Sequence, residues 1–306
     1  MPMLQDIFYW ILNMSIMASF TAVIIVLIRQ IKQIPRRLVV FLWLIPFLRL
    51  VFPLGLSSPY SLMTLVSKLS TKTVVVYEPV EGVDFSMTNF VMAADSYFPI
   101  TYKVNILEDI FRVGSVIWIV VAVLLFLSLV VSYITSLYEI KDYQQLRDNI
   151  YLSEKASSPA VYGIIAPKIV LPMDYQHKNT DLVILHEKTH IRGAHNLWRM
   201  LAFITVVVHW FNPLCWLFLR LFLADLELAC DEGVLVTLGE ARAKEYAHAL
   251  VDCKEEESLF ASSFGGAKLP TRIRNILTFK RLTWFSLTAF IALIGSVFYI
   301  LLTNAG

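Results

Sequence analysis

Long apolar runs dominate the chain, and four of them are of membrane-crossing length. They are Ile7–Ile28, Leu38–Leu54, Val113–Ser132 and Leu282–Leu302. A helix needs about 20 apolar residues to cross the hydrocarbon core of a bilayer. The first run has no basic segment before it and is too long for the core of a cleavable signal peptide. We therefore predict four transmembrane helices, the first two forming a hairpin over residues 1–54.

Basic residues predict how these helices are oriented. Arg29, Lys32, Arg36 and Arg37 lie in the short loop after the first run, and five more lie just before the last run: Lys268, Arg272, Arg274, Lys280 and Arg281. Short basic loops stay in the cytoplasm. Both termini and the loop 55–112 are therefore expected outside the cell. Within that loop, Thr73–Tyr77 could form a strand.

Residues 133–281, between the predicted spans 113–132 and 282–302, are more polar and should form a cytoplasmic domain. Tyr138–Lys155 is typical of a charged helix. Val161–Ile165 and Lys168–Leu171 are bounded by Pro and Gly, which indicates edge strands or a short hairpin. Such an edge could bind an extended peptide, or it could be purely structural.

Two shorter apolar runs lie further along this domain, at Leu197–Val208 and Pro213–Leu223. Either they are buried core helices or they dip into the inner leaflet. Arg199 and Arg220 would then reach lipid headgroups. His209, between the runs, is interpreted as a packed core residue. Ala241–Glu257 should form an amphipathic helix.

Composition supports a membrane protein. Hydrophobic residues make up 57% of the 306 residues and charged residues only 16%, against about 45–50% and about 25% in soluble domains. The net charge of +2 gives no sign of direct nucleic-acid binding. The three cysteines suggest no disulfide framework. The predicted fold class is a mainly α, polytopic membrane protein whose cytoplasmic domain contains a small sheet.

The chemistry concentrates in Leu182–His190, which reads LVILHEKTH. His186 and His190 are four residues apart and share a helix face. Two imidazoles so placed can bind one metal ion, and Glu187 could reach a water on that metal. HExxH is the arrangement of zinc peptidases, in which the Glu acts as general base. The alternative is a polar helix face with two solvated histidines.

Catalytic zinc needs a third protein ligand. An acidic cluster at Asp225–Glu232 follows the second short run, and it either binds metal or is a solvated helix end. We predict Glu227 as the ligand and Asp231, one turn later, as an acceptor that orients a ligand histidine. The rivals for third ligand are His195, Cys230 and Glu232. His195 would point about 140° away from His190 on a continued helix. His248 or Tyr246 could stabilise an oxyanion.

Four motifs in this order resemble the BlaR/MecR-type membrane metallopeptidases: SPAVYGIIAPKIVLP, ILHEKTHIRGAHN, HWFNPLCW and DLELACDE. The resemblance implies a gluzincin-type zinc domain with ligands His186, His190 and Glu227. Glu187 is then the base, and Asp231 is a supporting residue. His195 departs from the family, which often has Asp at this position.

The resemblance also implies a regulatory endopeptidase that cuts a cytoplasmic helix-turn-helix repressor, itself, or both, in signalling of the antibiotic-resistance type. The matching self-cleavage site is Ser263–Phe264. Family sensors carry a penicillin-binding domain after the last span, and no Ser-x-x-Lys motif follows here. Either that domain has been removed or this is a short member regulated by a sensor protein. A homodimer is the other expected association. Two other functions stay open, a catalytically silent receptor subunit or scaffold and a prenyl-protease type enzyme.

Overall fold

The computed structural model describes residues 2–31, 33–52, 57–58, 60–61, 105–139, 142–177, 180–252, 266–281 and 283–305. The predicted strand at Thr73–Tyr77 and the predicted self-cleavage site at Ser263–Phe264 lie outside these residues. So does most of the predicted loop 55–112.

Among the described residues, three helices are long and apolar enough to cross a membrane. They are α1 (Pro2–Ile28), α6 (Asn105–Glu139) and α13 (Trp284–Leu302). Helix α6 begins before the predicted Val113 and continues past Ser132. Only 17% of the most apolar window of α6 and 6% of that of α13 is buried. These exposed apolar surfaces are suited to lipid, because a soluble monomer rarely exposes such large apolar patches.

The predicted second span, Leu38–Leu54, is not one helix in the structure. It forms α2 (Arg36–Leu42) and α3 (Leu44–Val51), which are separated at Trp43. Pro46 explains the break, because it lacks the N–H group that would bond to the carbonyl of Leu42 in a continuous helix. The prediction of one continuous helix over this segment is therefore wrong, and a membrane crossing made by α2 and α3 together stays a prediction.

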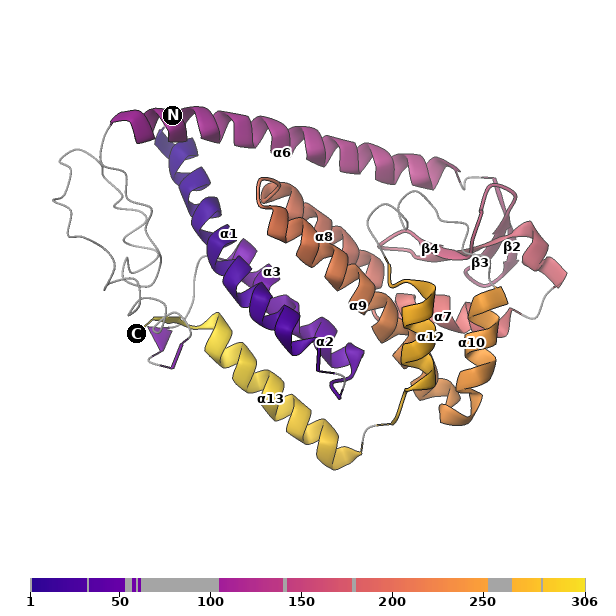
Figure 1. Ribbon diagram of the computed structural model, residues 1–306. Coiled ribbons are helices and arrows are strands. Elements are labelled where there is room, and N and C mark those ends of the chain that lie inside the picture. The colour runs from indigo at the N-terminus through magenta and orange to yellow at the C-terminus, as the bar shows by residue number, and fades with distance from the viewer. Residues whose placement is uncertain are drawn as a thin grey trace.

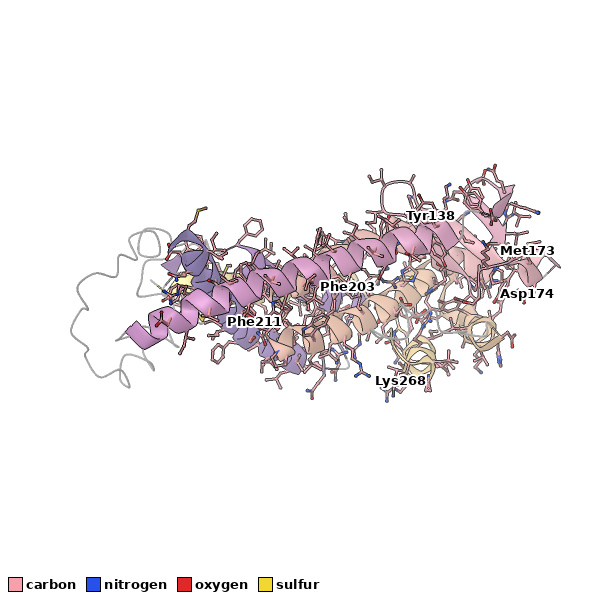
Figure 2. The ribbon with its side chains drawn as sticks, turned by 90° about the horizontal axis from the view of Figure 1, so that it is seen from above. Tyr138, Met173, Asp174, Phe203, Phe211 and Lys268 are labelled. Carbon is pink, nitrogen blue, oxygen red and sulfur yellow. The ribbon has the colours of Figure 1, made fainter. Side chains whose placement is uncertain are left out.

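Helices α8 (His195–Val208) and α9 (Pro213–Leu238) form a hairpin that lies between α1 and α6 (Figure 1). Seen from above, α6 lies over this hairpin, with Phe203 and Phe211 beneath it (Figure 2). Asn212 caps α9 by accepting the Leu214 N–H at 2.9 Å. The buried faces of α8 and α9 fit the first of the two sequence interpretations, helices of the protein core, and entry of the hairpin into the membrane stays a prediction.

Several polar groups at the tip of this hairpin are paired inside the protein. The Trp118 indole donates to the Val208 carbonyl at 2.8 Å, and the Trp210 indole donates to the Trp118 carbonyl at 3.2 Å. His209 is buried, as predicted, and its Nε2 lies 3.0 Å from the Leu50 carbonyl. These contacts join the tip of the hairpin to α6 and α3.

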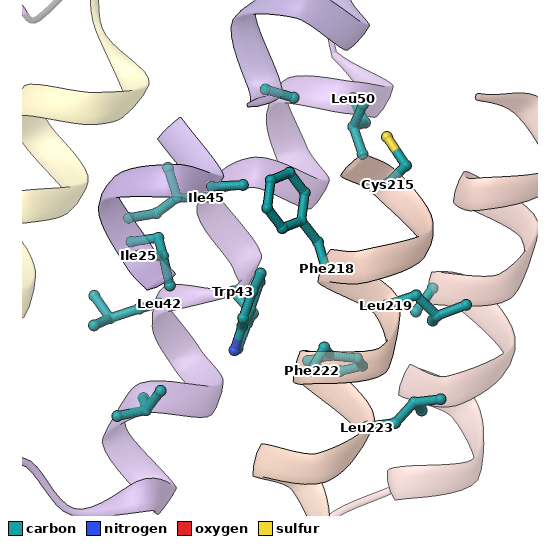
Figure 3. Close-up of a cluster of buried hydrophobic side chains, with 14 of the residues drawn as sticks. Ile25, Leu42, Trp43, Ile45, Leu50, Cys215, Phe218, Leu219, Phe222 and Leu223 are labelled. Atoms are coloured by element: carbon teal, nitrogen blue, oxygen red, sulfur yellow. The ribbon is translucent and has the colours of Figure 1, made fainter. Parts of the chain in front are cut away.

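The largest apolar core joins α9 to α1, α2 and α3 (Figure 3). Trp43 faces Phe218 of α9 across it, and Ile25 and Leu42 belong to the same core. Because these side chains are almost completely buried, α9 is packed tightly against the N-terminal helices.

A four-stranded sheet follows α6 (Figure 1). Its strands are β2 (Tyr143–Arg147), β3 (Ile150–Ser153), β4 (Ala160–Tyr162) and β5 (Lys168–Pro172), in the order β2-β3-β5-β4. Strands β2–β3 and β4–β5 are antiparallel, and β3–β5 is parallel. The predicted pair of short strands at 161–171 is confirmed.

The predicted helix at Tyr138–Lys155 is wrong, because this segment contains the end of α6 and then β2 and β3. Asp148 adopts φ 44° between the two strands, and this turn lets the chain reverse. Ile150 and Leu152 are then buried against Ile184. Burial of these alternate residues outweighs the helical preference of the charged residues.

The remaining helices lie at the same end of the molecule as the sheet (Figure 1). They are α7 (Asp181–Arg192), α10 (Ala243–Asp252) and α12 (Leu269–Leu277), with 3-10 turns at Met173–His177 and Glu240–Arg242. At the opposite end, β1 (Ser57–Ser58) pairs in parallel with β6 (Asn304–Ala305). Both chain ends lie there (Figure 1).

Candidate metal centre

Helix α7 carries the predicted motif and buries it. His186, Glu187 and His190 are 8%, 7% and 6% exposed, which excludes the alternative of two solvated histidines. The i, i+4 spacing places both imidazoles on one face. Their Nε2 atoms lie 3.1 Å apart, so both rings present a nitrogen to the same point.

Glu227 of α9 lies beside this pair of nitrogens. Its Oε2 is 3.8 Å from His186 Nε2 and 3.7 Å from His190 Nε2. Two ligands of a tetrahedral zinc ion are about 3.3 Å apart when each bond is about 2.0–2.1 Å. The three measured separations bracket that value, so this set fits a tetrahedral metal.

The outer nitrogen of His186 is hydrogen-bonded to Tyr246, which links it to Asp231. Its Nδ1 lies 2.8 Å from the Tyr246 hydroxyl, which donates to Asp231 Oδ1 at 2.7 Å. Asp231 Oδ1 is itself 3.5 Å from Nδ1. Asp231 therefore orients His186 chiefly through Tyr246, a link that the sequence did not reveal.

Neither residue named for an oxyanion role faces the Nε2 side. Tyr246 is on the Nδ1 side of His186, and His248 is exposed on α10.

His195 contacts His190 instead of pointing away from it. The two Nδ1 atoms are 2.8 Å apart. The expected 140° separation assumed one continuous helix, but α7 ends at Arg192 and Ala194 adopts φ 49°. A Cβ at Gly193 would lie 2.3 Å from His195 Nε2, so a side chain at this position would have to displace the His195 ring. His195 is thus a neighbour of His190 on the side away from Glu227.

Cys230 is the strongest rival of Glu227 for the role of third ligand. Its sulfur and one nitrogen each of His186 and His190 all lie within 4.8 Å of one another. However, the sulfur is 3.6 Å from His186 Nδ1, away from the paired Nε2 atoms. Burial and then the neighbouring carboxylates raise the pKa of Cys230 well above 9. A protonated thiol is a poor metal ligand, so we favour Glu227.

The acidic cluster on α9 is not a solvated helix end, since Asp225 and Asp231 are fully buried. Glu232 faces α2 and accepts the N–H groups of Arg36 and Arg37 at 3.0 and 3.2 Å. It is therefore already occupied and is not suited to be the third ligand.

Two arginines of the site were not recognised in the sequence. Arg199 pairs with Glu227 Oε1, which corrects the expectation that it reaches lipid headgroups. Arg272 of α12 donates from Nε and Nη2 to both oxygens of Asp231 at 2.9 Å, and its Nη2 lies 3.4 Å from His186 Nε2. Buried carboxylates require nearby cations, and this requirement could have indicated from the sequence that arginines pair with the acidic residues of α9.

Burial dominates the electrostatics of the site. It lowers the pKa of His186 to about 4 and that of His190 to about 3, and it raises the pKa of Glu187 to about 7, assisted by the charge of Glu227. For Glu227, burial raises the pKa, but His190, Arg199 and Arg272 outweigh it and hold the pKa well below 4.5. Near neutral pH the two imidazoles are uncharged and Glu227 is ionised, as metal binding requires.

Strand β4, beside α7, is an edge strand, as a peptide-binding strand would have to be. Asn196 Nδ2 already donates to the Val161 carbonyl at 2.9 Å and to the Gly163 carbonyl at 3.1 Å. Part of this edge is therefore occupied by the protein itself. Binding of a peptide along β4 stays a prediction.

The geometry agrees with a comparison to known families. The pattern of the BlaR1 peptidase M56 family matches residues 9–278, which is most of the chain. The chain belongs to this family. Membership in the BlaR1 peptidase M56 family makes a peptidase the expected class of enzyme for the site on α7.

Individual relatives are similar over shorter regions. The chain is 30% identical to the Regulatory protein BlaR1 of Bacillus licheniformis over 133 residues, which are 40% of this chain and 22% of that protein. It is 27% identical to the Methicillin resistance mecR1 protein of Staphylococcus aureus over 108 residues, 34% of this chain and 18% of that protein. The matched part is thus less than a quarter of each relative's length.

Proposed function

We propose that this M56-family chain is a zinc-dependent endopeptidase of the bacterial cell membrane. The observation that carries the proposal is the convergence of His186, His190 and Glu227 beside the buried Glu187. His186 Nε2, His190 Nε2 and Glu227 Oε2 would hold the ion. When bound, zinc supplies a Lewis acid that polarises a carbonyl and acidifies water.

The residues around these ligands supply the rest of the chemistry. Glu187 would take a proton on its carboxylate and pass it to the leaving amine; its pKa of about 7 suits exchange near neutral pH. Arg272 lies on the Nε2 side of His186, where a cation can stabilise developing negative charge. It takes the place proposed for His248 or Tyr246.

The substrate we propose is a cytoplasmic protein, a transcriptional repressor of the helix-turn-helix type, together with the chain itself at Ser263–Phe264. Names of the relatives refer to regulation and methicillin resistance, which supports a signalling role. We propose the orientation of the sequence interpretation, with both termini outside and the metal centre cytoplasmic, in which α2 and α3 together make the second crossing. A sensor protein, or a second copy of the chain, would supply the signal.

Substitution of Glu187 tests the proposed reaction. Purified full-length wild type and Glu187→Gln, each with zinc content measured, would be incubated and their fragments mapped by mass spectrometry. We expect Glu187→Gln to retain zinc and to lose cleavage by about a hundredfold or more. Glu245→Gln, at an exposed ion pair with Arg242, serves as control. Equal cutting by wild type and Glu187→Gln would refute the assignment, and zinc uptake without any cutting would indicate a silent subunit.

A further inference from the structure

The carboxylates of α9 face two directions. Asp225 and Glu232 are seven residues apart, about 20° short of two full turns, so they lie on one face of the helix. Glu227 is about 200° from Asp225, and Asp231 is one turn beyond Glu227. The second pair meets α7 and α12 at the metal centre, whereas the first pair meets the loop and helix that follow α1.

Asp225 is fully buried and has several partners in this N-terminal part. Arg29 donates to both of its oxygens, from Nε and Nη2, each at 2.9 Å. The Trp43 indole donates to Oδ2 at 2.9 Å, and Arg36 Nη1 lies 3.4 Å from Oδ1. Arg36 also donates to the Arg29 carbonyl at 2.9 Å. A bidentate arginine pair fixes direction as well as distance.

Glu232 connects α9 to the same segment by a different kind of contact. Its two oxygens accept the N–H groups of Arg36 and Arg37 in the first turn of α2. These N–H groups have no partner inside their own helix. Asn275 of α12 lies 3.5 Å from the same carboxylate. We call Asp225, Glu232 and their partners Arg29, Arg36, Arg37 and Trp43 the hairpin anchor.

We propose that Asp225 and Glu232 are positioning residues for the metal centre. Apolar packing between α9 and the N-terminal helices is non-directional. It therefore does little to fix the position of α9 along its axis or its rotation about that axis. A shift by one residue would turn the helix by about 100° and move it by about 1.5 Å. The hairpin anchor prevents that shift and holds Glu227 and Asp231 at α7.

This inference rests on the proposed function for its consequence, since misplacing Glu227 matters only if it binds metal. The hairpin anchor also connects the N-terminal helices physically to the metal centre. A displacement of α1 or α2 would reach Glu227 through Asp225 and Glu232, which lie on the same helix within about one and a half turns of it.

The test compares Asp225→Asn, Glu232→Gln and Arg29→Lys with wild type in the full-length chain in detergent. Asp252→Asn, an exposed position on α10, is the matched control. Zinc affinity is measured by competition with a chromogenic chelator. Amide hydrogen exchange of the chelated protein is measured in parallel and does not depend on zinc. We expect at least tenfold weaker zinc binding in Asp225→Asn and Glu232→Gln, as for residues that orient metal ligands, and faster exchange in α9.

The outcomes separate the two proposals. The positioning role is overturned if Glu232→Gln and Arg29→Lys bind zinc and exchange amide hydrogens like wild type. It is also overturned if the variants are less stable to heat but bind zinc with unchanged affinity. If Asp225→Asn does not fold, the two milder variants decide. If wild type takes up no zinc, the proposed function fails, and faster exchange in α9 of the variants still supports the anchor, whereas unchanged exchange overturns it.

Discussion

Three imidazoles lie in a row at the metal centre. His190 contacts His186 through Nε2 and His195 through Nδ1. Burial lowers the pKa of His186 to about 4, of His190 to about 3 and of His195 to about 4. Neutral histidines at physiological pH are ready to bind metal without losing protons. At acid pH the free energy of unfolding falls, because the histidines of the unfolded chain bind protons more readily than the buried histidines of the folded chain.

We therefore expect the stability of the metal-free chain to fall as the pH decreases from about 6.5 to about 4. In this window the unfolded state binds more protons at three histidines, so the free energy of unfolding rises with pH. Glu187 and Glu232, whose pKa values burial raises, act in the opposite direction, but they are two groups against three histidines. Thermal unfolding in chelator at pH 7 and pH 5 measures the effect, and His195→Asn should reduce it. Equal melting temperatures at both pH values would contradict the prediction.

At the scale of elements, the site depends on a close crossing of α7 and α9. Gly233 of α9 faces Thr189 of α7, and a Cβ at Gly233 would lie 2.8 Å from Thr189 Cγ2. Thr189 keeps its hydroxyl bonded to the Leu185 carbonyl at 2.8 Å, so the methyl group is held against the glycine. This crossing brings Glu227 within reach of the histidines.

Gly233→Ala should push the two helices apart. Overpacking costs about 1–3 kcal/mol, against a gain of about 1 kcal/mol in helix propensity, so we expect reduced stability and weaker zinc binding. Thr189→Ser removes the methyl group and keeps the hydroxyl. In the Thr189→Ser background, Gly233→Ala should then leave the stability unchanged or raise it. Chemical denaturation of wild type, Gly233→Ala, Thr189→Ser and the double variant measures the free energy of unfolding of each. If the double variant is no more stable than Gly233→Ala alone, the contact with the Thr189 methyl group is not the cause of the destabilisation.

At the scale of the whole molecule, the two ends of the chain are connected away from the metal centre. Arg49 of α3 is buried and donates to the carbonyls of Leu301 and Thr303 at 3.1 and 2.6 Å. The Ser61 hydroxyl also donates to the Thr303 carbonyl. One side of α13 also packs its apolar side chains against the N-terminal core, and these polar contacts add a directed attachment at its C-terminal end.

Arg49→Met should loosen the end of α13. It removes the Arg49 donor from the Leu301 carbonyl and leaves the Thr303 carbonyl with the Ser61 hydroxyl. Loss of a buried hydrogen bond costs about 1–3 kcal/mol, so we expect a melting temperature lower by a few degrees. Arg112→Met, at an exposed pair with Asp109 on α6, should change it little. Thermal unfolding of both variants in detergent provides the measurement. If Arg49→Met melts like Arg112→Met, the contact does not hold α13.

Features set by local spacing were predictable from the sequence. The i, i+4 histidines lie on one face because helix geometry is the same everywhere, and the apolar runs of α1, α6 and α13 form long helices. Glu227 was also found, because its acidic segment follows an apolar run and has few competitors. The wrong predictions occur where tertiary burial competes with local preference, as in β2 and β3, or where one proline interrupts a run, as at Trp43.

Only the tertiary structure decided which carboxylates face the metal centre and which face the N-terminal helices. Asp225 and Asp231 have the same side chain on the same helix, yet one pairs with Arg29 and the other with Arg272. Neither partner is near in sequence. The pairing depends on the rotation of α9 within the packed structure, which is a property of all its neighbours together and is not encoded in any local pattern.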